Sequence, residues 1–152
     1  MASSFRANVA YNIDESPNLE FTPDGTTVFY VGDLVYLDTS THTVKQCGAD
    51  PSLILGLSEV TSELAKVLTP NGKVPIRALT TTTVVAMPVN TTASADHEGT
   101  AYGVVKSADG IWQVDISDTS NTRVLVLKVD VTNKIYYVRF LAANLQLDAI
   151  AS

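Results

Sequence analysis

Two histidines and one cysteine are the most versatile reactive side chains in this 152-residue chain. His97 lies between Asp96 and Glu98, and the three side chains could together donate to a divalent cation. Adjacent residues of an extended strand point to opposite faces, however, so three consecutive side chains rarely converge on one ion. No Ser or Cys lies in a recognisable nucleophile motif that would join His97 or His42 to a catalytic triad. We therefore interpret both histidines as surface or turn residues.

Residues 115–122, with the sequence DISDTSNT, superficially resemble an oxygen-rich calcium loop. An EF-hand loop that began at Asp115 would need glycine at its sixth position and a carboxylate at its twelfth, where Ser120 and Val126 stand. We reject an EF-hand and keep a weaker calcium contact as the alternative. A phosphate-binding loop is also excluded, because no glycine precedes a Lys-Ser or Lys-Thr pair in the required frame.

Aromatic residues are the last candidates for a site, since Trp112 and the six tyrosines could line a ligand groove. Strands ordinarily carry aromatic residues to fill a core, which is the interpretation we prefer. Paired carboxylates for acid–base chemistry depend on a fold that brings them together, and spacing alone does not show such a pair. The sequence thus predicts no catalytic, cofactor-binding or metal-binding residue, no cofactor, and a protein that is not an enzyme.

Charge and composition narrow the possible partners. A net charge of −6 and a pI near 4.7, with ten scattered basic residues, argue against nucleic acid, whose binding depends on Lys and Arg. Cys47 is the single cysteine, which excludes an internal disulfide and fits assembly in a reducing compartment. Apolar runs fall far short of the roughly 20 residues that span a bilayer, and no secretory signal pattern is present. We expect no membrane partner and synthesis in the cytoplasm.

The elements that would position these side chains are predicted to be strands. Asp109-Gly110, Asp24-Gly25 and Asn71-Gly72 supply the backbone conformations that tight turns require. Segments rich in Val, Ile, Thr, Tyr or Leu predict strands at residues 26–37, 74–89, 101–106, 111–116, 123–129 and 135–141.

The predicted fold is all-β, β-sandwich or barrel-like and rich in hairpins. Residues 124–127 are apolar on both faces, which is typical of a strand buried between two layers. At most one short helix is expected, at residues 58–68, with a strand arm leading into Asn71-Gly72 as the alternative. Residues 1–23 are weakly patterned and predict an N-terminal arm, with a frayed terminus as the alternative. Residues 24–152 predict a single β-rich domain.

Two predicted hairpins share a feature that could indicate a duplicated unit. LDTSTHTV and VDVTNKIY each place an aspartate, Asp38 or Asp130, before a polar turn. The ordinary preference of turns for Asp, Ser and Asn explains this equally well and is the interpretation we favour over duplication.

Residues 28–90 contain a pattern of glycines and apolar residues at turn spacing. A Gly-Asp-apolar strand reaches an Asp-polar turn, returns through a valine, and enters an apolar-apolar-Gly-apolar segment. The residues are Gly32–Val35, Asp38–Thr41, Val44 and Ile54–Leu57, followed by GKVPIRALTTTTVVAM. This pattern resembles the small decoration, or cement, proteins of tailed-phage capsids.

The resemblance implies a structural virion protein that binds the outer surface of an expanded icosahedral capsid and stabilises it. It also implies a homotrimer, the major capsid protein as partner, and a location on the virion after synthesis in the host cytoplasm. Two other classes stay open. One is a head–tail joining or tail subunit, and the other is a carbohydrate-binding or cell-surface β module that would expose Trp112 and tyrosines.

Overall fold

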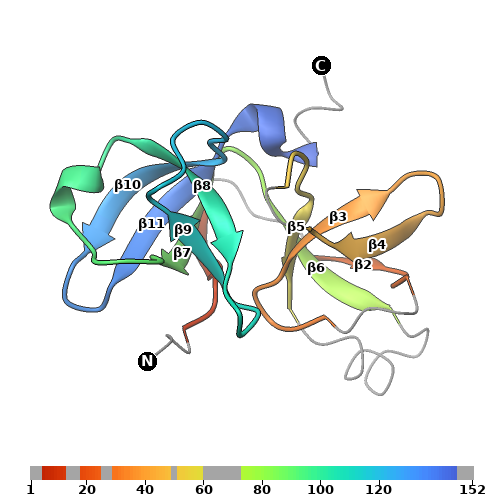
Figure 1. The fold of residues 1–152 in the computed structure, drawn as a ribbon. Helices are drawn as coiled ribbons and strands as arrows, with labels where there is room; N and C mark the ends of the chain where they lie inside the picture. The colour runs from red at the N-terminus through yellow and green to blue at the C-terminus, as the bar shows by residue number, and fades with distance from the viewer. Residues whose placement is uncertain (1–4, 13–17, 25–28, 49–50, 60–72, 147–152) are drawn as a thin grey trace.

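The protein folds into two antiparallel β-sheets, as the computed structural model in Figure 1 shows. The predicted all-β class is therefore confirmed. The predicted helix at residues 58–68 lies outside the described residues, apart from Ser58 and Glu59. The structure describes residues 5–12, 18–24, 29–48, 51–59 and 73–146.

The six-stranded sheet contains β1 (Asn8–Asn12), β7 (Thr83–Pro88), β8 (Ala101–Lys106), β9 (Trp112–Asp115), β10 (Val124–Asp130) and β11 (Ile135–Phe140). Its spatial order is β1-β7-β11-β10-β8-β9. The five-stranded sheet contains β2 (Asn18–Phe21), β3 (Leu34–Asp38), β4 (Thr43–Gln46), β5 (Gly56–Ser58) and β6 (Val74–Ala78). Its spatial order is β2-β6-β5-β3-β4. The described residues also form two 3₁₀ helices, η1 (Ala95–His97) and η2 (Ala142–Asn144).

Among the predicted strands, those at 74–89 and 26–37 differ most from the structure. The segment predicted at 74–89 is divided by a turn in which the Thr83 N–H donates to the Thr80 carbonyl, 3.1 Å away. In the segment predicted at 26–37, the described part becomes a strand only at Leu34, because Gly32 takes a positive φ of 85° that a strand cannot contain.

Each sheet closes on itself through a parallel bridge. Pro23 bridges to Val44 of β4, so strands β2–β6 form a ring that we call barrel 1. Val89 bridges to Val114 of β9, so strands β7–β11 form a second ring, barrel 2. Closure pairs the outer edges of a sheet where the bridge forms. Strand β1 lies outside the second ring, on β7.

The two barrels have the same topology. Adding five to each strand number converts the order of barrel 1 into that of barrel 2. The register of the pairs is also preserved, since Leu57 opposes Arg77 in barrel 1 and Leu125 opposes Arg139 in barrel 2. The connections from β2 to β3 and from β7 to β8 are equally long, at residues 22–33 and 89–100.

Equivalent hydrogen bonds fix the start of β3 and the approach to β8. The Gly32 N–H donates to the Ser58 carbonyl over 2.8 Å, and the Gly99 N–H donates to the Val126 carbonyl over 2.7 Å. Both glycines have positive φ angles, 85° and 83°. The chain therefore contains an internal structural repeat, in which a five-stranded barrel occurs twice.

The repeat does not relate the two aspartate hairpins that suggested a duplication. Asp38 precedes the turn between β3 and β4, which corresponds to the turn between β8 and β9. Asp130 precedes the turn between β10 and β11, which corresponds to the connection between β5 and β6. Local turn chemistry therefore explains why both hairpins contain an aspartate, which is the interpretation preferred above. The structural repeat instead relates the β3–β4 hairpin to the β8–β9 hairpin.

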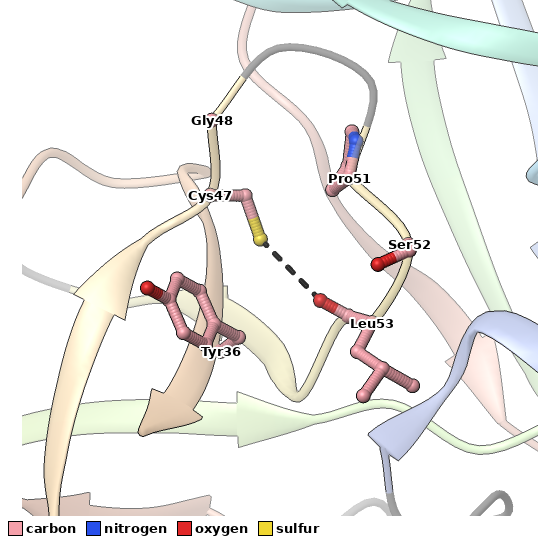
Figure 2. Close-up of a pocket in the computed structure, with 6 residues that line it drawn as sticks. All are labelled: Tyr36, Cys47, Gly48, Pro51, Ser52 and Leu53. Atoms are coloured by element: carbon pink, nitrogen blue, oxygen red, sulfur yellow. Dashed lines mark hydrogen bonds between the residues drawn. The ribbon is translucent and has the colours of Figure 1, made fainter. Parts of the chain in front are cut away.

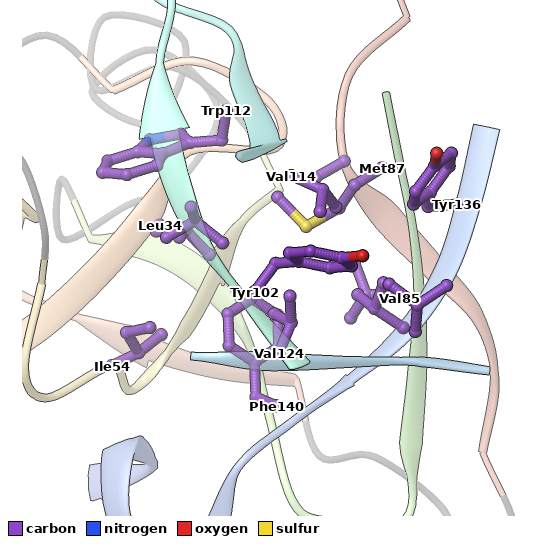
Figure 3. Packing of buried hydrophobic residues seen from close by; sticks show 14 of the residues in the cluster. Leu34, Ile54, Val85, Met87, Tyr102, Trp112, Val114, Val124, Tyr136 and Phe140 are labelled. Atoms are coloured by element: carbon purple, nitrogen blue, oxygen red, sulfur yellow. The ribbon is translucent and has the colours of Figure 1, made fainter. Parts of the chain in front are cut away.

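The main hydrophobic cluster joins the barrels. It contains Leu34 and Ile54 from barrel 1 together with Trp112 and Val124 from barrel 2, and Figure 3 shows these side chains in one packed group. A second, smaller cluster belongs to barrel 1 alone. Its buried members are Phe29, Val35, Val44, Leu55, Val74 and Ile76.

The side chain of Gln146 forms hydrogen bonds with the backbone of β3. The Gln146 side chain accepts a hydrogen bond from the Leu37 N–H, at 2.9 Å, and donates one to the Leu37 carbonyl, at 2.8 Å. Ile54 also bridges to Leu145 in parallel. The amide of Gln146 thus takes the place that a neighbouring strand would occupy.

The segment predicted as an N-terminal arm contributes to both sheets of its own chain. Asn8–Asn12 pairs with β7, and Asn18–Phe21 pairs with β6. Ala7 is buried within the main cluster. Strands β1 and β2 are the end strands of their sheets.

Candidate functional site

The structure directs the side chains of Asp96, His97 and Glu98 to different partners. His97 Nδ1 lies 2.5 Å from the Tyr136 hydroxyl, and the carboxylate of Glu98 accepts a hydrogen bond from the Val129 N–H at 2.8 Å. Asp96 is exposed, and its own N–H is capped by a neighbouring serine hydroxyl. Residues Ala95–His97 form the 3₁₀ helix η1 and not the extended strand on which the sequence argument was based, and the side chains of His97 and Glu98 contact different elements.

Tyr136 anchors η1 to barrel 2. Its hydroxyl accepts a hydrogen bond from the Ser94 N–H at 3.1 Å in addition to its contact with His97. Burial raises the pKa of Tyr136, so the phenol keeps its proton at neutral pH. The ring of His97 also lies edge-on to Tyr102, with 5.6 Å between the ring centroids. This arrangement is a packed structural contact around a half-buried histidine.

The oxygen-rich segment at 115–122 uses its carboxylates to shape turns. Asp115 Oδ1 accepts hydrogen bonds from the Ser117 N–H at 3.0 Å and from the Asn90 amide at 2.9 Å. Asp118 Oδ1 accepts the Ser120 N–H at 3.1 Å. The Ser117 hydroxyl also donates to Asp115, which lowers the pKa of that carboxyl. The bonds from Ser117 and Ser120 are local bonds of the kind that Asp makes in turns, whereas the bond from Asn90 joins Asp115 to the segment after β7.

The remaining sequence candidates also have structural positions. His42 lies exposed at the tip of the β3–β4 hairpin with a positive φ of 58°. Trp112 is 1% exposed within the main cluster, so it offers no open ring face to a sugar. Its indole nitrogen has no hydrogen-bond partner in the structure.

A pocket of about 340 Å³ lies beside β3. Figure 2 shows the Cys47 thiol pointing toward the Leu53 carbonyl, to which it donates a weak hydrogen bond at 3.8 Å. Burial raises the pKa of Cys47 to about 12, so the thiol stays protonated and is a poor nucleophile. The residues that line the pocket are Tyr36, Cys47, Gly48, Pro51, Ser52 and Leu53. None of these lining residues is an Asp, Glu, His, Lys or Arg.

Asp33 is a buried carboxylate that the sequence did not reveal as such. Its Oδ2 accepts the Tyr30 N–H at 2.9 Å and the Gln46 amide at 2.6 Å. Its Oδ1 has no hydrogen bond and lies 3.9 Å from the Arg6 guanidinium. Burial raises the pKa of Asp33, although the hydrogen bonds and the charges of Arg6 and Lys106 oppose this effect.

The role of Asp33 is to join three separate segments. It holds the loop before β3, the last residue of β4, and the segment that leads into β1. The available signal was the residue type alone, because Asp side chains often bond to nearby backbone groups in loops and turns. The sequence alone could not indicate that the distant Arg6 would approach it.

Two broader searches concern the described residues. In that part of the chain, no group of three or more His, Cys, Asp and Glu side chains has an arrangement that could hold a metal ion. None of the helices there has the length and apolar character needed to span a membrane. Comparisons with protein-family models, curated proteins and solved structures find no match.

Proposed function

We propose that the protein is a structural virion subunit that binds the outer surface of an expanded tailed-phage capsid as a homotrimer and stabilises it. Its partner is the major capsid protein, and its location is the virion after synthesis in the host cytoplasm. The observation that carries this proposal is that the first resembling residues, Gly32–Val35, Asp38–Thr41, Val44 and Ile54–Leu57, lie together in barrel 1, while the described residues that follow them continue through β6 into β7 of barrel 2. No covalent chemistry is required for this function.

The resembling residues are linked by backbone hydrogen bonds. The Leu55 N–H, just before β5, donates to the Val35 carbonyl over 2.7 Å. At the other end of β3, Asp38 Oδ1 accepts the Ser40 N–H at 2.9 Å and the Ser40 hydroxyl at 2.6 Å. Lys45 donates to the second oxygen of Asp38 at 2.7 Å. A hairpin held in this way loses little conformational freedom when it binds another protein, which favours affinity.

Stabilisation of a shell follows from mass action. A subunit that binds only the assembled, expanded lattice stabilises it by RT ln(1 + [L]/Kd) at each site, about 2.7 kcal/mol at a hundredfold excess over Kd. A trimer that contacts several capsid subunits at once adds avidity without further contacts. Many modest contacts across the lattice then resist heat and internal pressure.

Apolar contacts should carry most of the affinity for the shell. The chain has a net charge of −6, which favours basic patches on a partner, but exposed ion pairs contribute only about 0–1 kcal/mol each. Tyr30 and Val31, within the resembling segment, are 47% and 45% exposed and adjacent in the chain. Large apolar side chains that become buried contribute more to an interface than rim charges do. We assign these two residues to the contact with the capsid.

The test is to add the purified protein to undecorated expanded shells and to follow their melting temperature. Bound subunits and a higher melting temperature are expected, with binding that weakens only partly at high salt. An unchanged melting temperature with no bound subunits would contradict the proposal.

A pair of variants locates the contact. Val31→Asp should reduce binding to shells, because it places a charge in the apolar contact. Val131→Asp is the matched control, since Val131 is 50% exposed in the turn after β10, outside the resembling segment. Equal binding by the two variants would show that Tyr30 and Val31 do not form the contact.

A further inference from the structure

The two barrels differ at one outer edge. In barrel 2, β1 pairs antiparallel with β7, with Asn8 opposite Ala86 and Val9 opposite Val85. In barrel 1, β2 takes the place of β7 and is the end strand of its sheet. Among the described residues, no strand pairs with the Asn18–Glu20 end of β2 on the side away from β6. Barrel 1 therefore has an open edge where barrel 2 has an added strand.

Side-chain exposure reflects this difference. Leu19 opposes Ile76, and Val85 opposes Val138 at the equivalent position, so Leu19 and Val85 correspond in the repeat. Val85 is 0% exposed, whereas Leu19 is 41% exposed. Val9 of β1 pairs with Val85 and packs against the main cluster. An additional strand beside β2 would give Leu19 the neighbour that it lacks.

The backbone of β2 is oriented to accept such a strand. The Glu59 N–H donates to the Pro75 carbonyl over 3.0 Å, so the polar backbone of Pro75 faces β5. Glu20 opposes Pro75 and forms a non-hydrogen-bonded pair with it. The N–H and C=O of Glu20 therefore point away from β6, toward the open edge. The equivalent residue in barrel 2, Ala86, is the one that faces Asn8 of β1.

Strand β1 is also the end strand of its sheet, and no strand of the described residues pairs with its outer side. The described part of each chain thus carries two unlike open edges, one on β1 and one on β2. Exposed edges with unpaired N–H and C=O groups are templates for pairing with another chain. We propose that the outer edge of β2 in one copy pairs with the outer edge of β1 in a second copy.

A second copy fits better than an exchange of β1 between chains. Each chain has one β1, and moving it to β2 would uncover residues 83–86 of β7, which are buried. Pairing of β1 with β2 satisfies both open edges in every copy. The contact is head-to-tail, and such contacts close into rings when the rotation between copies permits. The inference deepens the homotrimer of the proposed function and rests on it, but it can fail separately from shell binding, since self-association is measured on the protein alone.

The decisive variant is Glu20→Pro. Proline removes the outward N–H but leaves the bonds between β2 and β6, because proline is tolerated where an edge N–H faces solvent. Glu20→Thr is the matched control, since it also removes the charge but keeps the N–H. Sedimentation velocity over a range of concentrations should show one oligomer for the wild type and Glu20→Thr. Glu20→Pro should associate about tenfold more weakly.

A second pair of variants keeps the test independent of proline. Leu19→Lys should weaken association, because it places a charge beside the incoming strand. Leu53→Lys is the control, as Leu53 is also 41% exposed but belongs to the pocket near Cys47. Circular dichroism establishes that each variant is folded. A wild-type monomer at all concentrations, or equal association by the two members of either pair, would overturn the proposal.

Discussion

Barrel 1 and barrel 2 have the same strand topology, but side chains of different size occupy equivalent positions. Gly56 opposes Ala78 in barrel 1, and the equivalent pair in barrel 2 is Val124 and Phe140. A Cβ on Gly56 would lie 2.2 Å from the Arg77 carbonyl oxygen, so the strands of barrel 1 are too close there for any larger residue. The pairing register is therefore retained while the packing changes.

The difference in packing indicates that the two barrels contribute unequally to the stability of the fold. Every residue of β7 is buried, whereas Leu19 and Glu20 of β2 are exposed. The large buried aromatic residues Trp112, Tyr136 and Phe140 belong to barrel 2, and Phe29 belongs to the smaller cluster of barrel 1. We conclude that barrel 2 supplies most of the main hydrophobic cluster.

The largest effect is expected for Phe140→Ala. Phe140 is 1% exposed in the main cluster, and truncation of a buried phenylalanine costs about 3–5 kcal/mol in the free energy of unfolding. Urea denaturation measures this loss. Leu127→Ala, at a residue of barrel 2 that is 39% exposed, is the control and should change stability far less. Similar losses for both variants would contradict the assignment of the core to buried residues of barrel 2.

A smaller difference in stability is expected between alanine substitutions at the two equivalent glycines, Gly32 and Gly99. Gly99→Ala should cost about 1–2 kcal/mol, because its positive φ is unfavourable for alanine and nothing lies within 4 Å of the added Cβ. Gly32→Ala should cost roughly 1–3 kcal/mol more, since its Cβ would lie 2.7 Å from the Ala7 carbonyl oxygen. Thermal unfolding of the two variants gives the comparison. If Gly99→Ala were the more damaging, the two glycines would not be equivalent in the way described.

The smallest effect concerns pH and the buried carboxylate of barrel 1. The pKa of Asp33 is raised from 3.8 by burial, so the folded state holds this proton more tightly than the unfolded state does. The stability of the wild type relative to Asp33→Asn should therefore be greatest below pH 3.8 and fall as pH rises through the folded pKa. Urea denaturation of both proteins between acid and neutral pH measures this difference. A difference that grew with pH would mean that Arg6 and Lys106 outweigh burial.

Sequence reasoning was most successful where local chemistry decides the structure. The strand at 101–106 was predicted with the observed bounds, and Asp109-Gly110 forms the expected turn with a positive φ of 79° at Gly110. Alternation and turn residues act over a few positions, so a single sequence reveals them. The same local signals indicated the all-β class.

Features that depend on distant residues could not be predicted in this way. The repeat preserves backbone pairing but not side chains, as the substitution of Val124 and Phe140 for Gly56 and Ala78 illustrates. The burial of Asp33 likewise depends on Arg6, which is remote in the sequence. The sequence predicted no catalytic or metal site, and its candidates at His97 and Asp115 have structural contacts, but it did not identify the open edge of β2.

The two hydrogen bonds between the Gln146 side chain and the Leu37 backbone form late in synthesis. A ribosome produces the chain from its N-terminus, so all strands of barrel 1 emerge long before residue 146. Until then the backbone of Leu37 lacks the amide that completes it in the finished protein. β1 must likewise await β7. Barrel 1 can therefore begin to fold on the nascent chain, but it can reach its final form only after residue 146 has been made.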